Sequence, residues 1–257
     1  MKSKLPAKVP VGKSKLVELK ETLIAASQIL YGENLWEFWG EGHPSMRIEG
    51  TEYFLLQGHR HDQGMGMGDV RNANDVNVMD LEGRVVEGRN PPMDETFIHA
   101  AIYKARPGVN GVAYTHPIYS KVLASSGRDL RAVHHWAWIF GERVPTLDTN
   151  GPIRSWEKAQ LMMNALGKRN SLMLWNSHGI VTVGKSVKEA VVLNVIFEKS
   201  AKVQYMSELL GEPKTVATRT QEQIDAYVDT RVEILWNHLV RKHWHLGRSR
   251  HRNRPRA

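Results

Sequence analysis

The sequence predicts a three-layer α/β/α domain built around a central, mostly antiparallel sheet. Segments with the apolar spacing of amphipathic helices flank several short runs that have the length and composition of strands. Some of these runs are joined by short hairpin-type turns, which connect antiparallel neighbours. Helices on both sides would bury the two faces of such a sheet.

Length and composition favour one α/β unit with a full core. The chain has 257 residues, of which 41% are hydrophobic, enough for a single domain of this class. It has no cysteine, so any metal must bind His, Asp, Glu or Tyr side chains. No run approaches the length of a membrane span, and the amino end lacks the apolar stretch of a signal peptide. We therefore expect a soluble cytoplasmic protein.

The net charge of +8 comes largely from basic residues at the two ends of the chain. No hydrophobic periodicity accompanies them, so solvated tails are the simpler interpretation, and a nucleic-acid partner is not expected. The alternative is an arm that binds nucleic acid or closes over a neighbouring subunit. The expected organisation is a basic tail (1–15), the α/β domain (16–211), a helical extension (212–245) and a second basic tail (246–257).

The first half of the chain opens with a predicted helix from Leu16 to Tyr31, which Gly32 ends. A loop over residues 40–45 precedes a hairpin whose strands contain residues 46–48 and 53–56. Glycine then recurs at every second position from 64 to 68, which is typical of a mobile loop. A phosphate cradle is the alternative, but the segment lacks a lysine and a following helix pattern.

The remaining elements follow from the same patterns. Two short strands, 76–79 and 84–87, surround a turn at 80–83. We expect further strands at 112–114, 172–174 and 180–183, and helices at 96–106, 117–125, 155–166, 188–210 and 220–243.

Three separate segments supply a carboxylate and two imidazoles. Glu95 stands just ahead of a predicted helix, His116 ends a predicted strand, and His178 lies in the turn between two others. Acid and imidazole groups are the ingredients of a metal site. Taken singly, each has a structural explanation, such as a first-turn acid or a hydrogen-bonded core histidine.

These segments resemble the class II aldolase/adducin superfamily. That pattern has Ser-Ser-Glu before a helix, His-Thr-His-Pro at a strand end and Asn-His-Gly later, and here the positions read Met93-Asp94-Glu95, Tyr114-Thr115-His116-Pro117 and Ser177-His178-Gly179. The run VMDLEGRVVEG (78–88) is also similar. The resemblance implies the three-layer fold, a homotetramer with sites at subunit interfaces, and a divalent metal such as zinc, manganese or iron. It makes His116 and His178 the matching metal ligands and Glu95 the matching acid/base.

Tyr114 stands where the first metal-binding histidine of that pattern is expected. A neutral phenol is a poor ligand, so Tyr114 would bind a metal only with its pKa far below the usual value of about 10. Three outcomes remain open: Glu95 binds the metal directly, Tyr114 binds it as a phenolate, or the site holds no metal. We count Tyr114 with Glu95 as a candidate catalytic residue.

A second departure concerns the phosphate of the sugar-phosphate aldolases. The positions that hold it in the family correspond here to His43, Ser45, Met93 and Asp94. Aspartate repels a phosphate and methionine cannot donate a hydrogen bond to it. We therefore expect a non-phosphorylated hydroxy, keto or hydroxyaryl acid, with His43, Ser45 and Asp94 among the substrate-binding residues.

Aromatic and imidazole side chains suggest a flat or apolar substrate. They are Trp36, Trp39, His134, His135, Trp136 and Trp138, and we include His134 and His135 among the candidate substrate contacts. The alternative is that the tryptophans pack in the core. His99 shares a helix face with Glu95 and is expected to support the site or the core, while His59 and His61 form a weaker candidate ligand pair.

The resulting hypothesis is a metal-dependent carbon–carbon lyase. Aldol cleavage and decarboxylation both place negative charge on a carbon and a neighbouring oxygen, which a divalent cation can stabilise. Decarboxylation is slightly favoured over aldol cleavage, and Glu95 would move the proton. The alternatives are a non-haem iron oxygenase on the same fold and a non-catalytic, adducin-like scaffold.

Overall fold

A mixed eight-stranded sheet forms the centre of the protein. The computed structural model describes residues 9–59, 64–141, 143–149 and 151–249, with side chains described as far as residue 243. The strand order is β4-β3-β2-β1-β5-β8-β7-β6, and only the β6–β7 pair is parallel. The strands are β1 (Gly42–Arg47), β2 (Tyr53–Gln57), β3 (Val76–Asp80), β4 (Val85–Glu87), β5 (Gly111–Thr115), β6 (Thr146–Leu147), β7 (Leu172–Trp175) and β8 (Gly179–Gly184).

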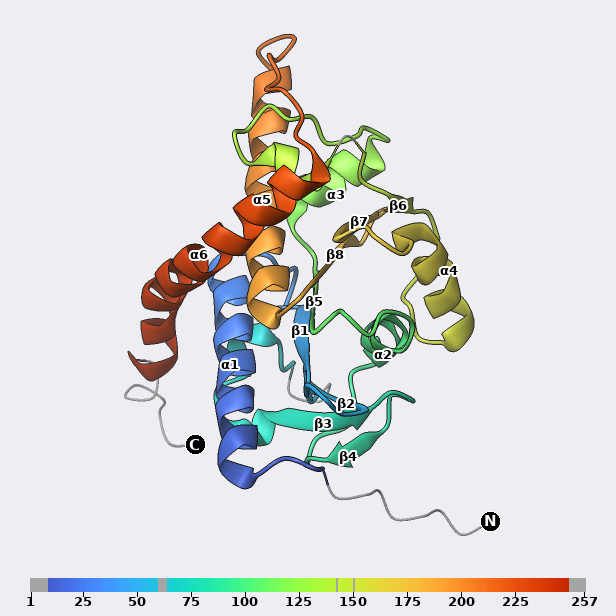
Figure 1. Ribbon diagram of the computed structural model, residues 1–257, viewed down its shortest axis with the longest axis vertical. Coiled ribbons are helices and arrows are strands. Elements are labelled where there is room, and N and C mark those ends of the chain that lie inside the picture. Colours follow the sequence, from blue (N-terminus) through green and yellow to red (C-terminus); the bar gives the residue numbers. More distant parts are fainter. Residues whose placement is uncertain (1–8, 60–63, 142, 150, 250–257) are drawn as a thin grey trace.

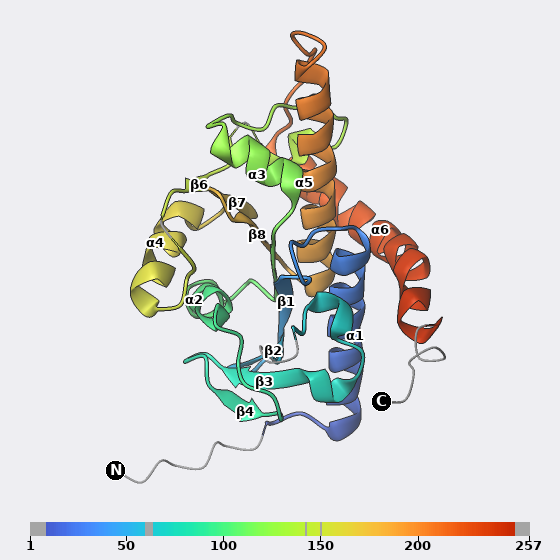
Figure 2. The same cartoon turned by 180° about the vertical axis from the view of Figure 1, so that it is seen from behind.

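Helices cover both faces of this sheet, which confirms the predicted three-layer α/β/α class. α1, α5 and α6 lie on one side and α2 and α4 on the other (Figures 1 and 2). The helices are α1 (Lys13–Gly32), α2 (Thr96–Ala105), α3 (Ile118–Ser125), α4 (Trp156–Leu166), α5 (Val187–Glu208) and α6 (Gln221–Ser249), with short 3₁₀ turns η2 (Met67–Asp69), η3 (Ala73–Asp75) and η4 (Ala137–Phe140). None of the helices in the described part of the chain has the length and apolar character that crossing a membrane requires.

Three sequence expectations differ from the structure. The expected loop at 40–45 is largely strand β1, because residues 42–46 pair with β5. Pro44 is tolerated there because β1 pairs with β2 only from Ser45 onward. The glycine-rich segment is packed from Met65 onward, with Met67 fully buried, whereas residues 60–63 lie outside the described part. The expected basic tail from 246 begins as helix, because α6 continues to Ser249.

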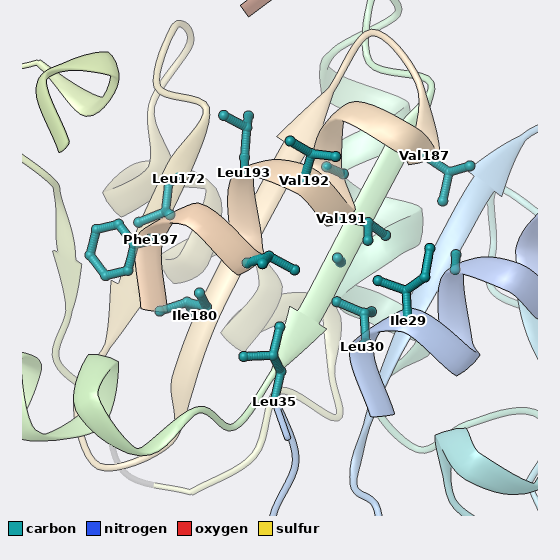
Figure 3. Close-up of a cluster of buried hydrophobic side chains, with 14 of the residues drawn as sticks. Ile29, Leu30, Leu35, Leu172, Ile180, Val187, Val191, Val192, Leu193 and Phe197 are labelled. Carbon is teal, nitrogen blue, oxygen red and sulfur yellow. The ribbon is translucent and has the colours of Figure 1, made fainter. Parts of the chain in front are cut away.

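The sheet separates two hydrophobic cores. One fills the space between the sheet and helices α1 and α5 (Figure 3), and the other lies under α2 and α4. Side chains alternate between these cores along β5, so that Ala113 joins the first while Val112 and Tyr114 join the second. Tyr114 therefore faces the α2 side.

A buried carboxylate at the end of α1 fastens helix α6 to the domain. Glu33, whose side chain is 4% exposed, accepts hydrogen bonds from Lys199 of α5 at 2.8 Å and from Lys242 and His243 of α6 at 2.6 and 2.7 Å. A side chain at Gly32 would collide with the His243 ring. Burial acts to raise the pKa of Glu33, but the three donors outweigh it and lower the pKa from 4.5 to about 2.

We expect Glu33→Gln to destabilise the protein at neutral pH by roughly 2 kcal/mol, since buried hydrogen bonds to a charged group are worth more than neutral ones. The pKa is lower in the folded state, so the contribution is complete above about pH 4.5 and is lost as the pH falls toward about 2. Urea unfolding at neutral pH and near pH 3 measures the difference from wild type, which should shrink at the lower pH. Glu18→Gln, at an exposed pair on the same helix, is the control. An equal effect of both substitutions would contradict the anchoring role.

Candidate active site

The pairing of β1 with β5 sets the wall of the site. His43 and Tyr114 are direct partners in this antiparallel pair, so their side chains project side by side on the α2 face. Their ring centroids lie 5.3 Å apart in an edge-to-face contact. The Tyr114 ring also meets His116 at 4.8 Å and Trp175 at 5.6 Å. Tyr114 thus lies at the centre of an aromatic and imidazole cluster.

The β7–β8 turn brings His178 against His116. The turn contains Ser177 at φ 63°, a left-handed conformation unusual for a residue with a side chain. Gly179 follows it, and a Cβ at this position would collide with the carbonyl oxygen of Thr115. Because glycine lacks that atom, the backbone of the turn approaches closely enough for His116 Nδ1 to reach His178 O at 2.9 Å.

Backbone carbonyls fix the tautomers of both histidines. His116 Nδ1 contacts His178 O, and His178 Nδ1 lies 3.3 Å from Asn176 O. A carbonyl only accepts, so each Nδ1 carries a hydrogen, and in the neutral ring Nε2 keeps the lone pair. The His178 ring is further held by stacking on Trp175 at 4.2 Å. Burial lowers the pKa of His116 to about 4, which keeps its imidazole neutral. Histidine binds a metal through a ring nitrogen that keeps its lone pair, while the other nitrogen donates its hydrogen to a neighbour.

Glu95 lies at the N-cap of α2 and is engaged by Arg154, a residue that sequence reasoning missed. Arg154 Nε lies 3.2 Å from Glu95 Oε1, and Arg154 Nη2 lies 3.1 Å from Asp94 Oδ2. The Glu95 side chain is 16% exposed and that of Arg154 is 54% exposed. A single arginine in the loop before α4 carries no sequence signal, because only the fold places this loop over the start of α2.

Three more charged residues missing from the sequence predictions lie on the same side of the site. Burial, followed by the negative charges of Glu37 and Glu95, raises the pKa of Glu41. Glu37 pairs with Lys121 at 2.6 Å.

Burial, followed by the charge of Glu95, also raises the pKa of Tyr114 well above its ordinary value. The phenol is therefore neutral.

A buried chain of hydrogen bonds lies behind His43. The Tyr103 hydroxyl contacts Ser45 Oγ at 2.8 Å, Ser45 Oγ contacts His99 Nδ1 at 2.6 Å, and His99 Nε2 contacts His43 Nδ1 at 2.7 Å. His99 is fully buried, and this burial lowers its pKa to about 3. Burial likewise lowers the pKa of His43 well below its ordinary value. Both imidazoles are neutral.

The direction of hydrogen donation along these bonds follows from Tyr103, at the end farthest from His43. Among the described residues, Ser45 Oγ is the one hydrogen-bond partner of the Tyr103 hydroxyl. Tyr103 must donate to it, since an unsatisfied buried hydroxyl is costly. Ser45 then donates to His99, and His99 donates to His43 Nδ1. His43 Nε2 consequently carries a hydrogen, and it is buried without a partner in the described structure. This N–H is a donor that takes no part in the hydrogen bonds to His99, Ser45 and Tyr103, and its ring lies beside Tyr114.

The structure does not group all the predicted substrate contacts. Ser45 is fully buried and its hydroxyl serves the internal chain, so it does not face a substrate. His134 bonds to Ser200 on α5 at 3.1 Å, and His135 packs on His134; neither contacts the cluster around Tyr114. Trp36 stacks on Tyr31, Trp136 and Trp138 pack on Tyr227 of α6, and Trp39 is 53% exposed. His99 has the supporting place expected of it.

The donor set fits a divalent cation in part. His116 and His178 offer two Nε2 atoms from adjoining segments, whereas Glu95 is held by Arg154. Among the residues described, no three His, Asp or Glu side chains converge closely enough to hold a metal. His59 lies near enough to His43 for its charge to lower the pKa of His43, and His61 lies outside the described residues. The third ligand is thus left open by the geometry.

Comparison with known protein sequences finds the same family as the sequence motifs. The family model for the class II aldolase and adducin N-terminal domain matches residues 21–205. An L-fuculose phosphate aldolase from Methanococcus maripaludis is 31% identical over 141 residues, 55% of this chain and 75% of that protein. A 5-deoxy-D-ribulose 1-phosphate aldolase from Bacillus thuringiensis is 28% identical over 153 residues, 58% and 70% of the two chains.

Solved structures agree on the fold. An L-fuculose 1-phosphate aldolase from Glaciozyma antarctica superposes with a TM-score of 0.74 at 22% identity, covering 94% of both chains. YgbL from Escherichia coli, described as a putative aldolase/epimerase/decarboxylase, superposes with a TM-score of 0.65 at 20% identity, covering 82% of this chain and 98% of its own.

We expect divalent metal to copurify with the protein and to depend on the two histidines whose Nε2 atoms are available. Elemental analysis should find near-stoichiometric zinc, manganese or iron in the wild type, loss in His116→Ala and His178→Ala, and retention in Tyr114→Phe, because a neutral phenol contributes little as a ligand. His134→Ala, distant from the cluster, is the control. Loss of metal in Tyr114→Phe would identify a phenolate ligand, and metal-free protein after incubation with all three ions would contradict a metal site.

Proposed function

The chain belongs to the class II aldolase and adducin family, and we propose that it is a metal-dependent lyase that cleaves a carbon–carbon bond in a non-phosphorylated hydroxy or keto acid. The observation that carries this proposal is the pair His116 and His178, whose Nδ1 atoms both contact backbone carbonyls, with Glu95 near enough to Tyr114 for its charge to raise the pKa of that phenol. A divalent cation held by His116 and His178 would polarise a substrate oxygen and stabilise charge developing there.

We assign the proton transfers to Glu95. When the bond of a hydroxy acid is cleaved, the hydroxyl on one fragment loses a proton and the carbon of the other fragment gains one. A carboxylate within the site can carry out both transfers. Arg154 orients this carboxylate from one side and so acts as a positioning residue. Asp94 holds the same guanidinium, which gives the acid a use other than direct contact with substrate.

The surroundings favour an acid without a phosphate group. Ser45 uses its hydroxyl internally, Met93 is buried and cannot donate, and Asp94 carries a negative charge. These positions therefore lack the free hydroxyl donors that would bind a phosphate. The relatives named above act on phosphorylated sugars according to their names, whereas this chain has Met93 and Asp94 where the resemblance expects two serines before the glutamate.

His43 is the proposed anchor for the substrate. Its Nε2–H has no partner among the described residues, and a carbonyl, hydroxyl or carboxylate oxygen would satisfy it. The chain from Tyr103 through Ser45 and His99 fixes both the ring orientation and the hydrogen on Nε2. This arrangement supports recognition of an oxygen by a neutral donor.

The proposal includes assembly into a homotetramer. Exposed apolar side chains lie along α3 and the end of α5, beginning two residues after His116: Ile118, Val122, Tyr205, Met206, Leu209 and Leu210. Such a face is typical of a protein–protein interface. A subunit packed there would lie beside the site.

We expect the purified protein to release pyruvate from 4-hydroxy-2-keto acids or carbon dioxide from β-keto acids, and to act less well on L-fuculose phosphate. Coupled assays for each product separate aldol cleavage from decarboxylation. Glu95→Gln should lower kcat by roughly 100-fold or more, as expected for loss of a general acid/base, while Glu212→Gln on the exposed surface should not. Preference for the phosphorylated sugar would contradict the proposed substrate class, and activity that survives Glu95→Gln would contradict the role of this residue.

Arg154→Met should lower kcat about tenfold with little change in KM, because a misplaced carboxylate loses transition-state stabilisation rather than substrate binding. Arg154→Lys keeps the charge but not the forked geometry, so its kcat should lie between those of the wild type and Arg154→Met. Thermal stability should change little, since exposed ion pairs contribute about 1 kcal/mol or less. Arg84→Met, at the exposed pair with Asp80, is the matched control. A raised KM with unchanged kcat would show that Arg154 binds the substrate instead.

A further inference from the structure

A cavity lies at the opposite end of strand β8 from the candidate active site. Its volume is about 680 Å³, within the range of small-molecule sites. Val183 and Gly184 at the end of β8 line it, whereas His178 precedes the start of that strand. At about 3.3 Å per residue, the length of β8 separates the two places by roughly 15 Å. The cavity is therefore not part of the aldolase-type site.

The walls combine an apolar floor with a basic rim. Phe140, Leu172 and Ile224 are among the apolar residues lining it. Five cations from four segments line it as well: Arg106, Arg143, Lys168, Arg169 and Lys185. The described lining contains two carboxylates, Glu189 and Asp225, so five positive charges face two negative ones and leave a net charge of +3. Both carboxylates also accept hydrogen bonds within the protein: Glu189 from the backbone N–H of Lys185, and Asp225 from the Gln221 amide.

Most of the rim cations are not neutralised by the protein. Lys185 pairs with Asp229 at 2.7 Å, and Arg143 lies 3.8 Å from Asp129. Arg106, Lys168 and Arg169 have no ion pair within the described part of the chain. Arg106 is half-buried, and one of its nitrogens donates to Asn170 O at 2.8 Å, which fixes the guanidinium at the edge of the cavity. Its other donors remain for a ligand.

Burial of an uncompensated cation favours binding of an anion. Desolvation lowers the pKa of Arg106, as it does for any cation removed from water without a counter-charge. A phosphate or carboxylate would supply that counter-charge, and guanidinium groups bind both through paired hydrogen bonds. The apolar floor would contact the remainder of an organic ligand.

We propose that this basic cavity binds a small organic anion carrying phosphate or carboxylate groups, at a site separate from the candidate active site. The inference does not rest on the proposed lyase activity. It depends only on the cavity, its charge and the fixed position of Arg106. Because α6 contributes Gln221, Ile224 and Asp225 to the wall, a bound ligand would also contact the helix that Glu33 fastens to the domain.

Isothermal titration calorimetry with pyrophosphate and with citrate tests the proposal and distinguishes the two anionic groups. The titrations use the full chain carrying His116→Ala, so that chelation at the candidate metal site does not contribute. We expect one saturable site per chain for at least one probe. Arg106→Gln combined with Lys168→Gln should weaken binding by about tenfold or more, because a tenfold loss corresponds to about 1.4 kcal/mol. Lys214→Gln, an exposed cation outside the cavity, should leave binding unchanged.

Three outcomes would overturn the proposal. The first is no saturable binding of either probe by a folded chain. The second is equal weakening by the cavity variant and by Lys214→Gln, which would indicate attraction by overall charge. The third is a cavity covered by a second copy of the chain, detected as an assembly in light scattering that the double cavity variant dissociates. Circular dichroism of each variant excludes loss of folding as the cause.

Discussion

The close approach of Gly179 to the Thr115 carbonyl is the constraint on which the site depends. β5 and β8 are adjacent in the sheet, and their antiparallel pairing runs as far as Thr115 and Ile180, which brings His116 and the turn that contains His178 to the same end. Because residue 179 has no side chain, the turn before β8 closes against the end of β5. The carbonyl of His178 then fixes the tautomer of His116. The missing Cβ thereby allows the contact that fixes which nitrogen His116 presents.

Neutrality inside the site and charge at its edge have one physical cause. His43, His99 and Tyr114 are removed from water, and burial favours the uncharged form of each. The acids Glu37, Glu41, Asp94 and Glu95 are only partly buried, and Lys121 and Arg154 offset part of their charge. Polar recognition in the interior is thus carried by directed hydrogen bonds, whereas ionic interactions are confined to the rim.

The sequence predicts the elements of this fold well where periodicity is strong and poorly where long-range pairing decides. The helices around Leu23 and Val191 follow from apolar spacing, and the turn at His178 follows from its polar break between strands. β1 contains Gly42 and Pro44, which locally disfavour a strand, and only pairing with β5 makes it one. Arg154 could not be predicted as part of the site, since its proximity to Glu95 arises from the placement of α4. Ser45 was expected to face a substrate because sequence position does not reveal that α2 supplies His99 and Tyr103 as its partners.

The differences from the family pattern that the sequence motifs indicate at positions 43, 94 and 114 are structurally connected rather than separate. Residues 43 and 114 are cross-strand partners, so a tyrosine in place of a histidine alters the space available to the side chain opposite it. An imidazole at 43 in turn needs a partner for Nδ1, which His99 provides only while Ser45 and Tyr103 satisfy its other nitrogen. Arg154 pairs with both Asp94 and Glu95 and so offsets the repulsion between these neighbouring carboxylates. Replacing Tyr114 alone with histidine would therefore leave His43 and its hydrogen-bonded chain directed at the same space.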